Sequence, residues 1–119
     1  MNIETLREYC LSKNGVSESF PFDQKTLVFK VLDKMFALTS VDSIELSINL
    51  KCDPEKSIEL REMYSFINPG YHMNKKHWNT IDIDNGVEEI LIKQLIDHSY
   101  DLVVSKMTKK QKESLKNEN

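Results

Sequence analysis

The chain has 119 residues, of which 39% are hydrophobic and 29% are charged, and it contains three glycines and three prolines. This composition is typical of one soluble globular domain, and it excludes a disordered or collagen-like chain. The formal net charge of −3 argues against a histone-like protein that binds nucleic acid with its whole surface. No apolar run approaches the roughly 18 residues of a membrane span, and the N-terminus lacks the pattern of a signal peptide. We therefore expect a cytoplasmic protein.

Charge is unevenly distributed along the sequence. Residues 82–101 carry six acidic side chains and one lysine, whereas residues 105–116 carry five lysines and one glutamate. A protein of this overall charge that contacts phosphate must therefore do so through a local cluster of cations.

The first third of the sequence predicts one helix and two strands. Apolar residues recur at helical spacing over residues 3–13, which predicts a helix. Residues 17–23 include a proline and are predicted to form a connector. Residues 25–32 and 35–41 are rich in Val, Leu and Phe, and they predict two strands joined by a turn at Asp33-Lys34.

The middle of the chain gives clearer signals. Residues 44–51 alternate strictly between apolar and polar side chains, which predicts a strand with one buried and one solvated face. Asp53, Pro54 and Glu55 supply an N-cap acceptor, a first-position proline and an acid in the first turn. Together they predict the start of a helix, which is expected to end before Asn68.

The last third predicts a strand over residues 78–83, a short strand near 70–73 and a long helix over 87–107 with a broad apolar stripe. The polar sequence KKQKESLKNEN at the end is expected to fray. The order helix, three strands, helix, two strands, helix predicts an α+β protein with two layers around an antiparallel sheet. We expect a single domain over residues 1–112 and a polar C-terminal tail over 113–119.

The segment Pro69–Thr80, with the sequence PGYHMNKKHWNT, carries most of the functional information. It holds the only Trp, two of the three His and an adjacent pair of Lys, and it has no acidic residue. Cations, amide donors and aromatic faces are the side chains that hold a phosphate backbone and its bases. The segment therefore favours an interaction with nucleic acid.

This segment resembles the signature of the MmcQ/YjbR family, whose members are often described as "double-wing" DNA-binding proteins. The resemblance covers roughly residues 3–112. Further segments fit the same pattern, namely Phe20-Pro21-Phe22-Asp23, Phe29-Lys30-Val31 with Lys34-Met35-Phe36, Leu50-Lys51-Cys52-Asp53-Pro54-Glu55 with Leu60-Arg61-Glu62, and Ile96-Asp97-His98-Ser99-Tyr100. The resemblance implies an α+β fold related in shape to secretion chaperones, and a non-catalytic DNA-binding function.

The same resemblance implies two wings, the hairpin around Asp33-Lys34 and the loop and strand over 70–80. The residues expected to contact DNA are Tyr71, His72, Asn74, Lys75, Lys76, His77 and Trp78. The two lysines would neutralise phosphates, the histidines and Asn74 would donate hydrogen bonds, and an aromatic ring would stack on a base. The alternative is a solvated loop in which Asn74 serves the backbone of its own turn.

Two outcomes are open for Trp78. Strand parity places it on the face of the sheet opposite Ile81 and Ile83. If that face is open to solvent, the indole can stack on a base, a contact of about 1–3 kcal/mol. Alternatively, a bulge returns Trp78 to the core, or the ring packs across the open face against Tyr71, because single Trp residues are usually well buried.

The sequence indicates no cofactor, no metal and no catalytic residue. His72 and His77 are five residues apart, and no third ligand suggests itself for the three or four that zinc requires. His98 has the spacing of a core position in the last helix. Cys10 and Cys52 form no CxxC motif and are expected to be free structural thiols. No P-loop, GxGxxG, GxSxG or HExxH motif is present.

We therefore expect a small binding protein, not an enzyme, that contacts DNA with modest affinity and no membrane, and a monomer is favoured. The alternative is a protein-interaction module, because secretion chaperones are small, often acidic and usually dimeric. An obligate dimer with a broad exposed apolar patch would indicate that class. A third alternative, a small-molecule binder, requires a deep pocket lined by the two histidines.

Overall fold

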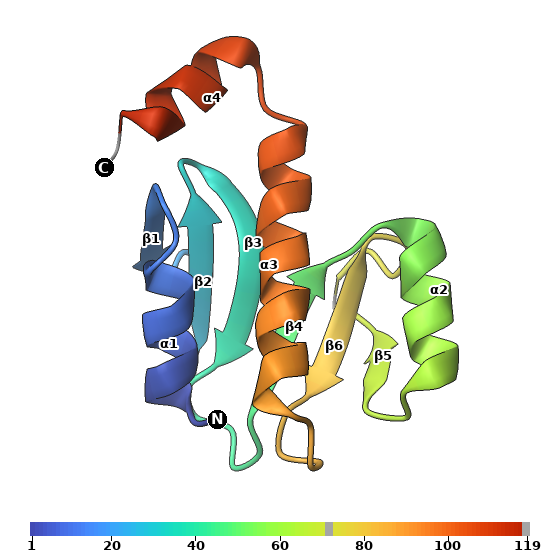
Figure 1. Ribbon diagram of the computed structural model, residues 1–119. Helices are drawn as coiled ribbons and strands as arrows, with labels where there is room; N and C mark the ends of the chain where they lie inside the picture. The colour runs from blue at the N-terminus through green and yellow to red at the C-terminus, as the bar shows by residue number, and fades with distance from the viewer. Residues whose placement is uncertain (71–72, 118–119) are drawn as a thin grey trace.

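The computed structural model describes residues 1–70 and 73–117, and within them the chain forms four helices and one six-stranded sheet (Figure 1). The helices are α1 (Ile3–Leu11), α2 (Pro54–Met63), α3 (Glu89–Ser105) and α4 (Lys109–Lys116). The strands are β1 (Val16–Ser19), β2 (Thr26–Val31), β3 (Lys34–Ser40), β4 (Ser47–Lys51), β5 (Ile67–Pro69) and β6 (Trp78–Asp82). None of the helices in these ranges has both the length and the apolar character that crossing a membrane requires.

The helices leave one face of the sheet uncovered. The strand order is β1-β2-β3-β4-β6-β5, and every neighbouring pair is antiparallel. Helices α1 and α3 lie over one face, and α2 packs beside β5 (Figure 1). We call the opposite face, which carries no helix in the described residues, the open face. The predicted α+β class, with two layers and an antiparallel sheet, is confirmed.

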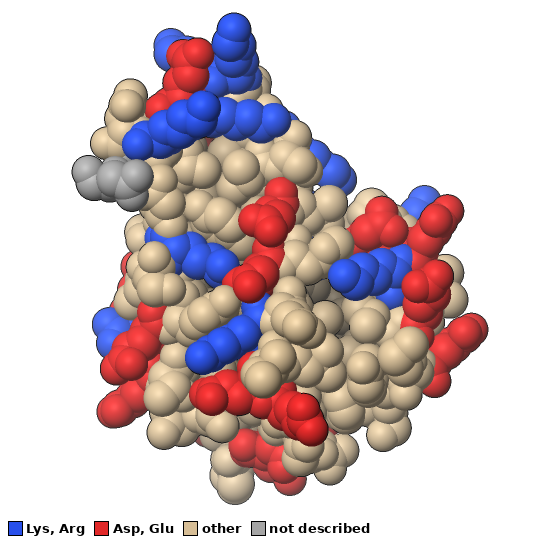
Figure 2. Space-filling model, in the orientation of Figure 1, with Lys and Arg blue, Asp and Glu red and all other residues tan. Residues whose placement is uncertain are grey.

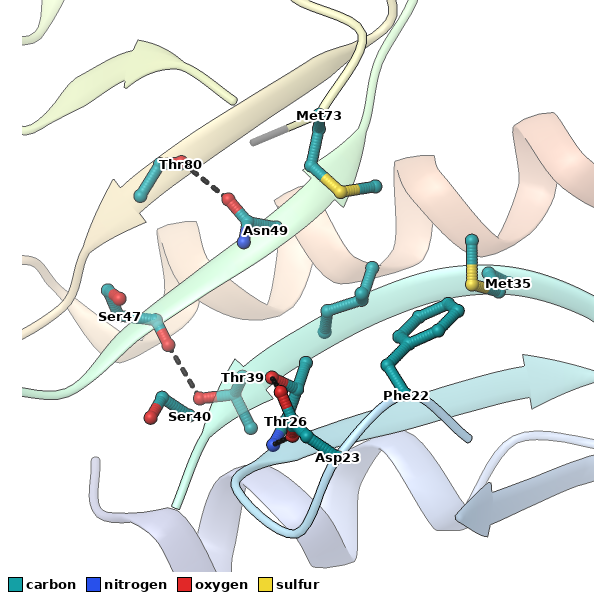
Figure 3. A pocket seen from close by; sticks show the side chains of 11 residues that line it. Phe22, Asp23, Thr26, Met35, Thr39, Ser40, Ser47, Asn49, Met73 and Thr80 are labelled. Atoms are coloured by element: carbon teal, nitrogen blue, oxygen red, sulfur yellow. Dashed lines mark hydrogen bonds between the residues drawn. The ribbon is translucent and has the colours of Figure 1, made fainter. Parts of the chain in front are cut away.

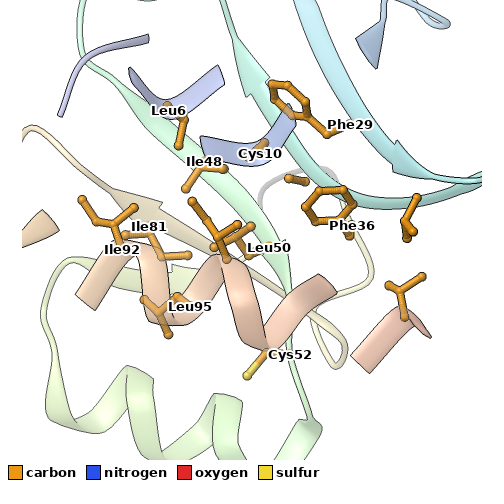
Figure 4. Close-up of a cluster of buried hydrophobic side chains, with 14 of the residues drawn as sticks. Leu6, Cys10, Phe29, Phe36, Ile48, Leu50, Cys52, Ile81, Ile92 and Leu95 are labelled. Atoms are coloured by element: carbon orange, nitrogen blue, oxygen red, sulfur yellow. The ribbon is translucent and has the colours of Figure 1, made fainter. Parts of the chain in front are cut away.

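The main core lies between the sheet and the helices. Alternation along each strand sends every second side chain under α1 and α3. Figure 4 shows this cluster, in which the strands contribute Phe29, Phe36, Ile48, Leu50 and Ile81 and the helices contribute Leu6, Cys10, Ile92 and Leu95. Burial of this apolar surface is the main source of stability of the fold.

A bulge in β3 adds a large ring to this core. The register between β2 and β3 shifts between Phe29 and Lys30, so that Phe36 has no partner opposite it. Both Phe36 and Ala37 are consequently buried in the main core. The Phe36 ring meets Tyr100 of α3 edge-on, with 5.5 Å between the ring centroids, a favourable aromatic geometry.

Two predictions about the strands were wrong: one strand was missed, and the start of another was misplaced. The connector predicted over 17–23 begins with an edge strand, β1, which escaped prediction because Val16 is its only apolar residue. The strand predicted to begin at residue 44 begins at Ser47, and Ile44 is fully exposed. Just before Ser47, Leu46 N donates to the Asp84 carboxylate over 2.6 Å and not to a neighbouring strand, while the Leu46 carbonyl oxygen accepts from Ile83 N over 3.0 Å.

The ends of two other predicted elements also differ. The short strand expected near 70–73 lies earlier, as β5, and residues 71 and 72 are outside the described residues. The tail expected to fray forms α4 over Lys109–Lys116. Thr108 and Gln111 form a reciprocal capping box at its start, and Leu115 is buried against the main core. The capping box and the buried Leu115 therefore explain why this segment is helical, although its polar composition predicted a frayed tail.

The open face carries a second, smaller apolar cluster. Trp78 is 6% exposed and packs with Val28 and Leu38, and Met35 and Met73 lie against them. The parity prediction is confirmed, because Ile81 belongs to the main core on the other face. The ring is buried on the open face, as one alternative predicted, and its described neighbours there are aliphatic strand residues and thioethers. Tyr71, the partner named in that prediction, lies outside the described residues.

Candidate functional site

A hollow of about 360 Å³ lies at the end of the sheet where β3 begins and β4 ends. Three lysines from three elements line it, because Lys34 begins β3, Lys51 ends β4 and Lys106 follows α3. The remaining described lining residues are Met35, Trp78, Val103 and Met107, and none of them is acidic. We call the three lysines and the space between them the lysine hollow.

The charges of the lysine hollow are not compensated by acids. Burial lowers the pKa of Lys51, and the positive charges of Lys106 and Lys34 lower it further. Among the described side chains, the ion pairs are Arg7–Glu18, Lys13–Asp97 and Lys25–Asp42, so none involves a lysine of the hollow. Like charges gathered around a partly enclosed space favour the binding of an anion.

Trp78 forms part of the floor of the lysine hollow. Lys51 and Trp78 are direct cross-strand partners on β4 and β6. The Nζ atom of Lys51 lies 6.0 Å from the centroid of the indole ring, at the outer limit of a cation–π contact. A base could stack on this face of the ring only if the ammonium group moved away.

The loop that leads into β6 is fixed by Arg61 of α2. Its Nη2 atom donates hydrogen bonds to the carbonyl oxygens of Lys75 and of Trp78, the latter over 3.2 Å. On the other side of the loop, Gly70 N donates to the Trp78 carbonyl oxygen over 2.8 Å. A Cβ atom on Gly70 would lie 2.8 Å from the Cβ atom of Trp78, so only glycine fits this approach without movement. These contacts fix the position of the loop relative to Trp78.

The predicted DNA-contacting lysines lie outside the lysine hollow. Lys75 Nζ donates a hydrogen bond to the Gly70 carbonyl oxygen over 3.3 Å, and Lys75 and Lys76 are both exposed. Neither belongs to the lining residues. Of the two predicted wings, the hairpin contributes Lys34 and the 70–80 segment contributes Trp78, so the two segments do meet at one place.

The other predicted contact residues have different roles. The Oδ1 atom of Asn74 accepts a hydrogen bond from the backbone N–H two residues further on, over 3.0 Å, so this side chain serves its own turn. His77 is half-buried, and its carbonyl oxygen accepts a hydrogen bond from Cys52 N over 2.8 Å. Tyr71 and His72 lie outside the described residues.

Three important residues were not among those predicted from the sequence. Lys51 is the last polar position of the alternating strand, and parity alone puts it on a solvated face. Its place beside Trp78 follows from the pairing of β4 with β6, which no local pattern reveals. Lys106 lies in the lysine-rich segment noted in the sequence, and Arg61 belongs to a segment quoted only for its family resemblance.

The helix-covered face shows a different distribution of charge. Figure 2 shows blue side chains gathered over α4 at the top of the molecule, with acidic and basic side chains mixed below. The lysines of α4 are Lys109, Lys110, Lys112 and Lys116. Below α4, this face therefore offers no continuous cationic surface.

Histidine and cysteine do not combine into a metal centre in the part of the chain that the structure describes, where no three His, Cys, Asp or Glu side chains are grouped to hold an ion. His98 Nε2 accepts a long hydrogen bond from Asp53 N over 3.4 Å, and burial lowers the pKa of the imidazole. Burial also raises the pKa of Cys10 to about 12, which keeps the thiol protonated. The surroundings of His98 and Cys10 are therefore those of residues that support the fold.

Comparison with known proteins gives a consistent family match. The family model named YjbR matches residues 11–102. The uncharacterized protein YbdF of Escherichia coli O157:H7 is 39% identical over 107 residues, which is 90% of this chain and 88% of that protein. The uncharacterized protein YjbR of Escherichia coli K12 is 32% identical over 115 residues, with 97% and 98% of the two chains covered.

Solved structures give the same result at the level of the fold. The crystal structure of protein DR2400 of Deinococcus radiodurans superimposes with a TM-score of 0.89 at 43% identity, covering 96% of this chain and 87% of that one. The crystal structure of a Pseudomonas syringae protein gives a TM-score of 0.74 at 29% identity, covering 86% and 98% of the two chains.

Proposed function

The chain belongs to the YjbR family, and we propose that it is a non-catalytic nucleic-acid-binding protein whose phosphate-binding site is the lysine hollow. One observation carries this proposal: Lys34, Lys51 and Lys106 come from separate parts of the chain and converge without an acidic neighbour in the lining. In a chain of net charge −3, such a local concentration of cations favours the binding of an anionic partner. Phosphate diesters provide it, because lysine neutralises their charge without a demanding geometry.

Further cations around the lysine hollow favour a polymer with several phosphates over a single small anion. Lys30 follows Val28 by two residues on β2 and so shares the open face with the apolar cluster. Lys75 and Lys76 are exposed on the loop that precedes Trp78. Cations on both sides of the lysine hollow allow successive phosphates of one strand to be neutralised.

A salt titration with a labelled DNA duplex tests this proposal. The logarithm of the binding constant should fall with the logarithm of the salt concentration, with a slope of about −0.9 for each neutralised phosphate and roughly −2 to −5 in total. The double substitution Lys34→Gln with Lys106→Gln should weaken binding and reduce the slope by about 2. Lys51 is left in place because its ammonium group also covers Trp78.

The matched control is Lys56→Gln with Lys110→Gln. These lysines are exposed on α2 and α4 and do not line the hollow, and the two double variants carry the same net charge. Binding by the control should equal that of the wild type. Absence of binding by the duplex and by a single strand of the same length, even near roughly 20 mM salt, where electrostatic attraction is strongest, would exclude the proposed function. Equal losses in both double variants would mean that net charge, and not the lysine hollow, governs binding.

A second candidate function is a protein-interaction module, favoured by an apolar groove near the start of α3. The groove has a volume of about 470 Å³, and Tyr64, Phe66 and Ile90 are among its lining residues. Ile90 is 69% exposed. If this groove is a self-association surface, light scattering should show a dimer that Ile90→Glu dissociates, and a monomer at all concentrations would exclude that role.

A further inference from the structure

A second hollow, of about 700 Å³, lies on the open face and meets the lysine hollow at Met35, which lines both. Figure 3 shows Phe22 and Met35 on one side of it and Met73 and Asn49 on the other. Leu38, from the apolar cluster of the open face, also lines it. We call this space the larger hollow. It combines an apolar surface with a polar wall, the name we give to the side lined by Thr39, Ser47, Asn49 and Thr80.

The polar wall has hydrogen-bonding capacity that the protein does not use. The hydroxyl of Thr80 donates to Asn49 Oδ1, and this bond fixes the amide so that its NH₂ group is turned away from Thr80 (Figure 3). Thr39 Oγ1 donates to the carbonyl oxygen of Ser47 over 2.6 Å. In the described residues, neither the NH₂ group of Asn49 nor the hydroxyl of Ser47 has a partner within the protein. Both can bond a polar edge of a ligand.

The charges of the two hollows have opposite signs. Asp23, which lines only the larger hollow, accepts hydrogen bonds from Lys25 N and Thr26 N over 2.8 and 2.6 Å. These donors lower the pKa of its carboxyl, so it stays ionised. No lysine or arginine is among the described residues that line the larger hollow. A ligand that fills both spaces must therefore place its anionic part among the lysines and a part without negative charge in the larger hollow.

We propose that the larger hollow holds an unpaired nucleobase while a phosphate of the same strand lies among Lys34, Lys51 and Lys106. This inference rests on the proposed function and specifies its ligand as single-stranded nucleic acid. The Phe22 ring and the thioethers of Met35 and Met73 suit the apolar faces of a base. Asn49 and Ser47 suit its hydrogen-bonding edge. A paired base cannot enter, because its faces are stacked and its edge is occupied.

An alkyl chain fits the larger hollow less well than a base. It would cover the Asn49 amide and the Ser47 hydroxyl without offering a hydrogen bond, and a buried polar group left without a partner is costly. A nucleobase offers polar edge atoms to those groups and apolar faces to Phe22 and the thioethers. The polar wall therefore selects a heteroaromatic ligand over a lipid tail.

The experiment compares three probes with the full chain at one salt concentration. They are an oligothymidylate of about twelve nucleotides, a strand of equal length made only of abasic sites, and the duplex of the same length. The oligothymidylate should bind at least about tenfold more tightly than the abasic strand. Phe22→Ala should abolish that preference and leave binding of the abasic strand unchanged. Phe22 is 64% exposed, so the variant should remain folded, which its melting curve checks.

Phe20→Ala is the matched control, because Phe20 is 47% exposed on the same connector and does not line the larger hollow. It should keep the full preference for bases. Equal binding of oligothymidylate and the abasic strand would overturn this inference and leave the proposed function standing. A preference that survives Phe22→Ala, or dodecyl phosphate that competes as well as a nucleotide, would also overturn it. Failure of every nucleic-acid probe to bind would remove both proposals.

Discussion

Arg61 Nε donates a hydrogen bond to Asn79 Oδ1 over 2.8 Å, and this contact ties α2 to the beginning of β6. Asn79 is 2% exposed, so its amide depends on partners within the protein. The same guanidinium donates to the carbonyl oxygens of Lys75, in the preceding loop, and of Trp78, at the start of β6. One side chain thus sets the position of the segment that carries Trp78 into the floor of the lysine hollow.

Replacing this arginine should cost considerable stability. Arg61→Met leaves Asn79 Oδ1 and the Lys75 carbonyl oxygen without this donor, whereas the Trp78 carbonyl oxygen keeps the hydrogen bond from Gly70 N. An unsatisfied buried polar group costs about 1–3 kcal/mol. Arg61→Lys should recover only part of the loss, because an ammonium group cannot reproduce the planar fork. Urea unfolding measures the free energy of unfolding. Arg7→Lys is the control, since Arg7 pairs with Glu18 on the surface, and an exposed ion pair contributes little to stability. Equal losses at both arginines would contradict this role of Arg61.

Gly70→Ala should also destabilise the entry to β6. The added Cβ atom would lie 2.8 Å from Trp78 Cβ and 3.0 Å from the Trp78 carbonyl oxygen, so the loop must shift. Such overpacking typically costs about 1–3 kcal/mol. Hydrogen exchange should show faster exchange at Gly70 N and in β6. Gly86→Asn is the comparison, because Gly86 has φ +77° with open space around it, and Asn tolerates that conformation. A larger loss at Gly86 than at Gly70 would contradict the steric argument.

Local signals in the sequence explain what could be predicted. Asp53 and Pro54 predicted the start of α2. The structure confirms this N-cap, because Asp53 Oδ2 accepts a hydrogen bond from Lys56 N over 3.2 Å. Parity placed Trp78 on the face opposite Ile81, which depends only on neighbours along one strand. Such features are encoded within a few residues, so the sequence alone was enough to find them.

Features that depend on strand order could not be predicted. Lys51 meets Trp78 only because β4 pairs with β6 across an intervening helix and strand. Lys106 reaches the same place because α3 ends beside the beginning of β3, some seventy positions earlier in the sequence (Figure 1). The lysine pair in 69–80 was visible in the sequence, whereas the three lysines that converge in the lysine hollow all come from outside this segment.

The Cys10 thiol should make stability depend on alkaline pH. Burial raises its pKa from 9.0 in the unfolded chain to about 12 in the folded protein. Since the folded value is the higher one, this stabilising effect is complete below pH 9 and is lost as pH rises toward 12. Between about pH 8 and about pH 10.5 the loss should be on the order of 2 kcal/mol.

The control separates Cys10 from lysines and tyrosines that also titrate. Cys10→Ala is less stable at neutral pH because it leaves a cavity, but its stability should fall less between those two pH values. A cysteine reagent added to the native wild type near pH 8 should react slowly, since both thiols are buried. Rapid labelling of both cysteines, or identical pH dependence in the variant, would contradict the assignment.

Trp78 is the only tryptophan, so its fluorescence reports on the floor of the lysine hollow alone. The ring is 6% exposed among Val28 and Leu38. Its emission should therefore be blue-shifted and resistant to acrylamide, and Trp78→Ala should lower the free energy of unfolding by about 3–5 kcal/mol. Trp78→Phe should cost less, because it keeps most of the apolar volume. Lys51→Met, which removes the ammonium group over the ring, should raise quenching only slightly because the strand residues still cover the indole. A red-shifted, readily quenched signal that nucleic acid protects would instead make Trp78 a stacking platform, and it would move the base from the larger hollow to the indole.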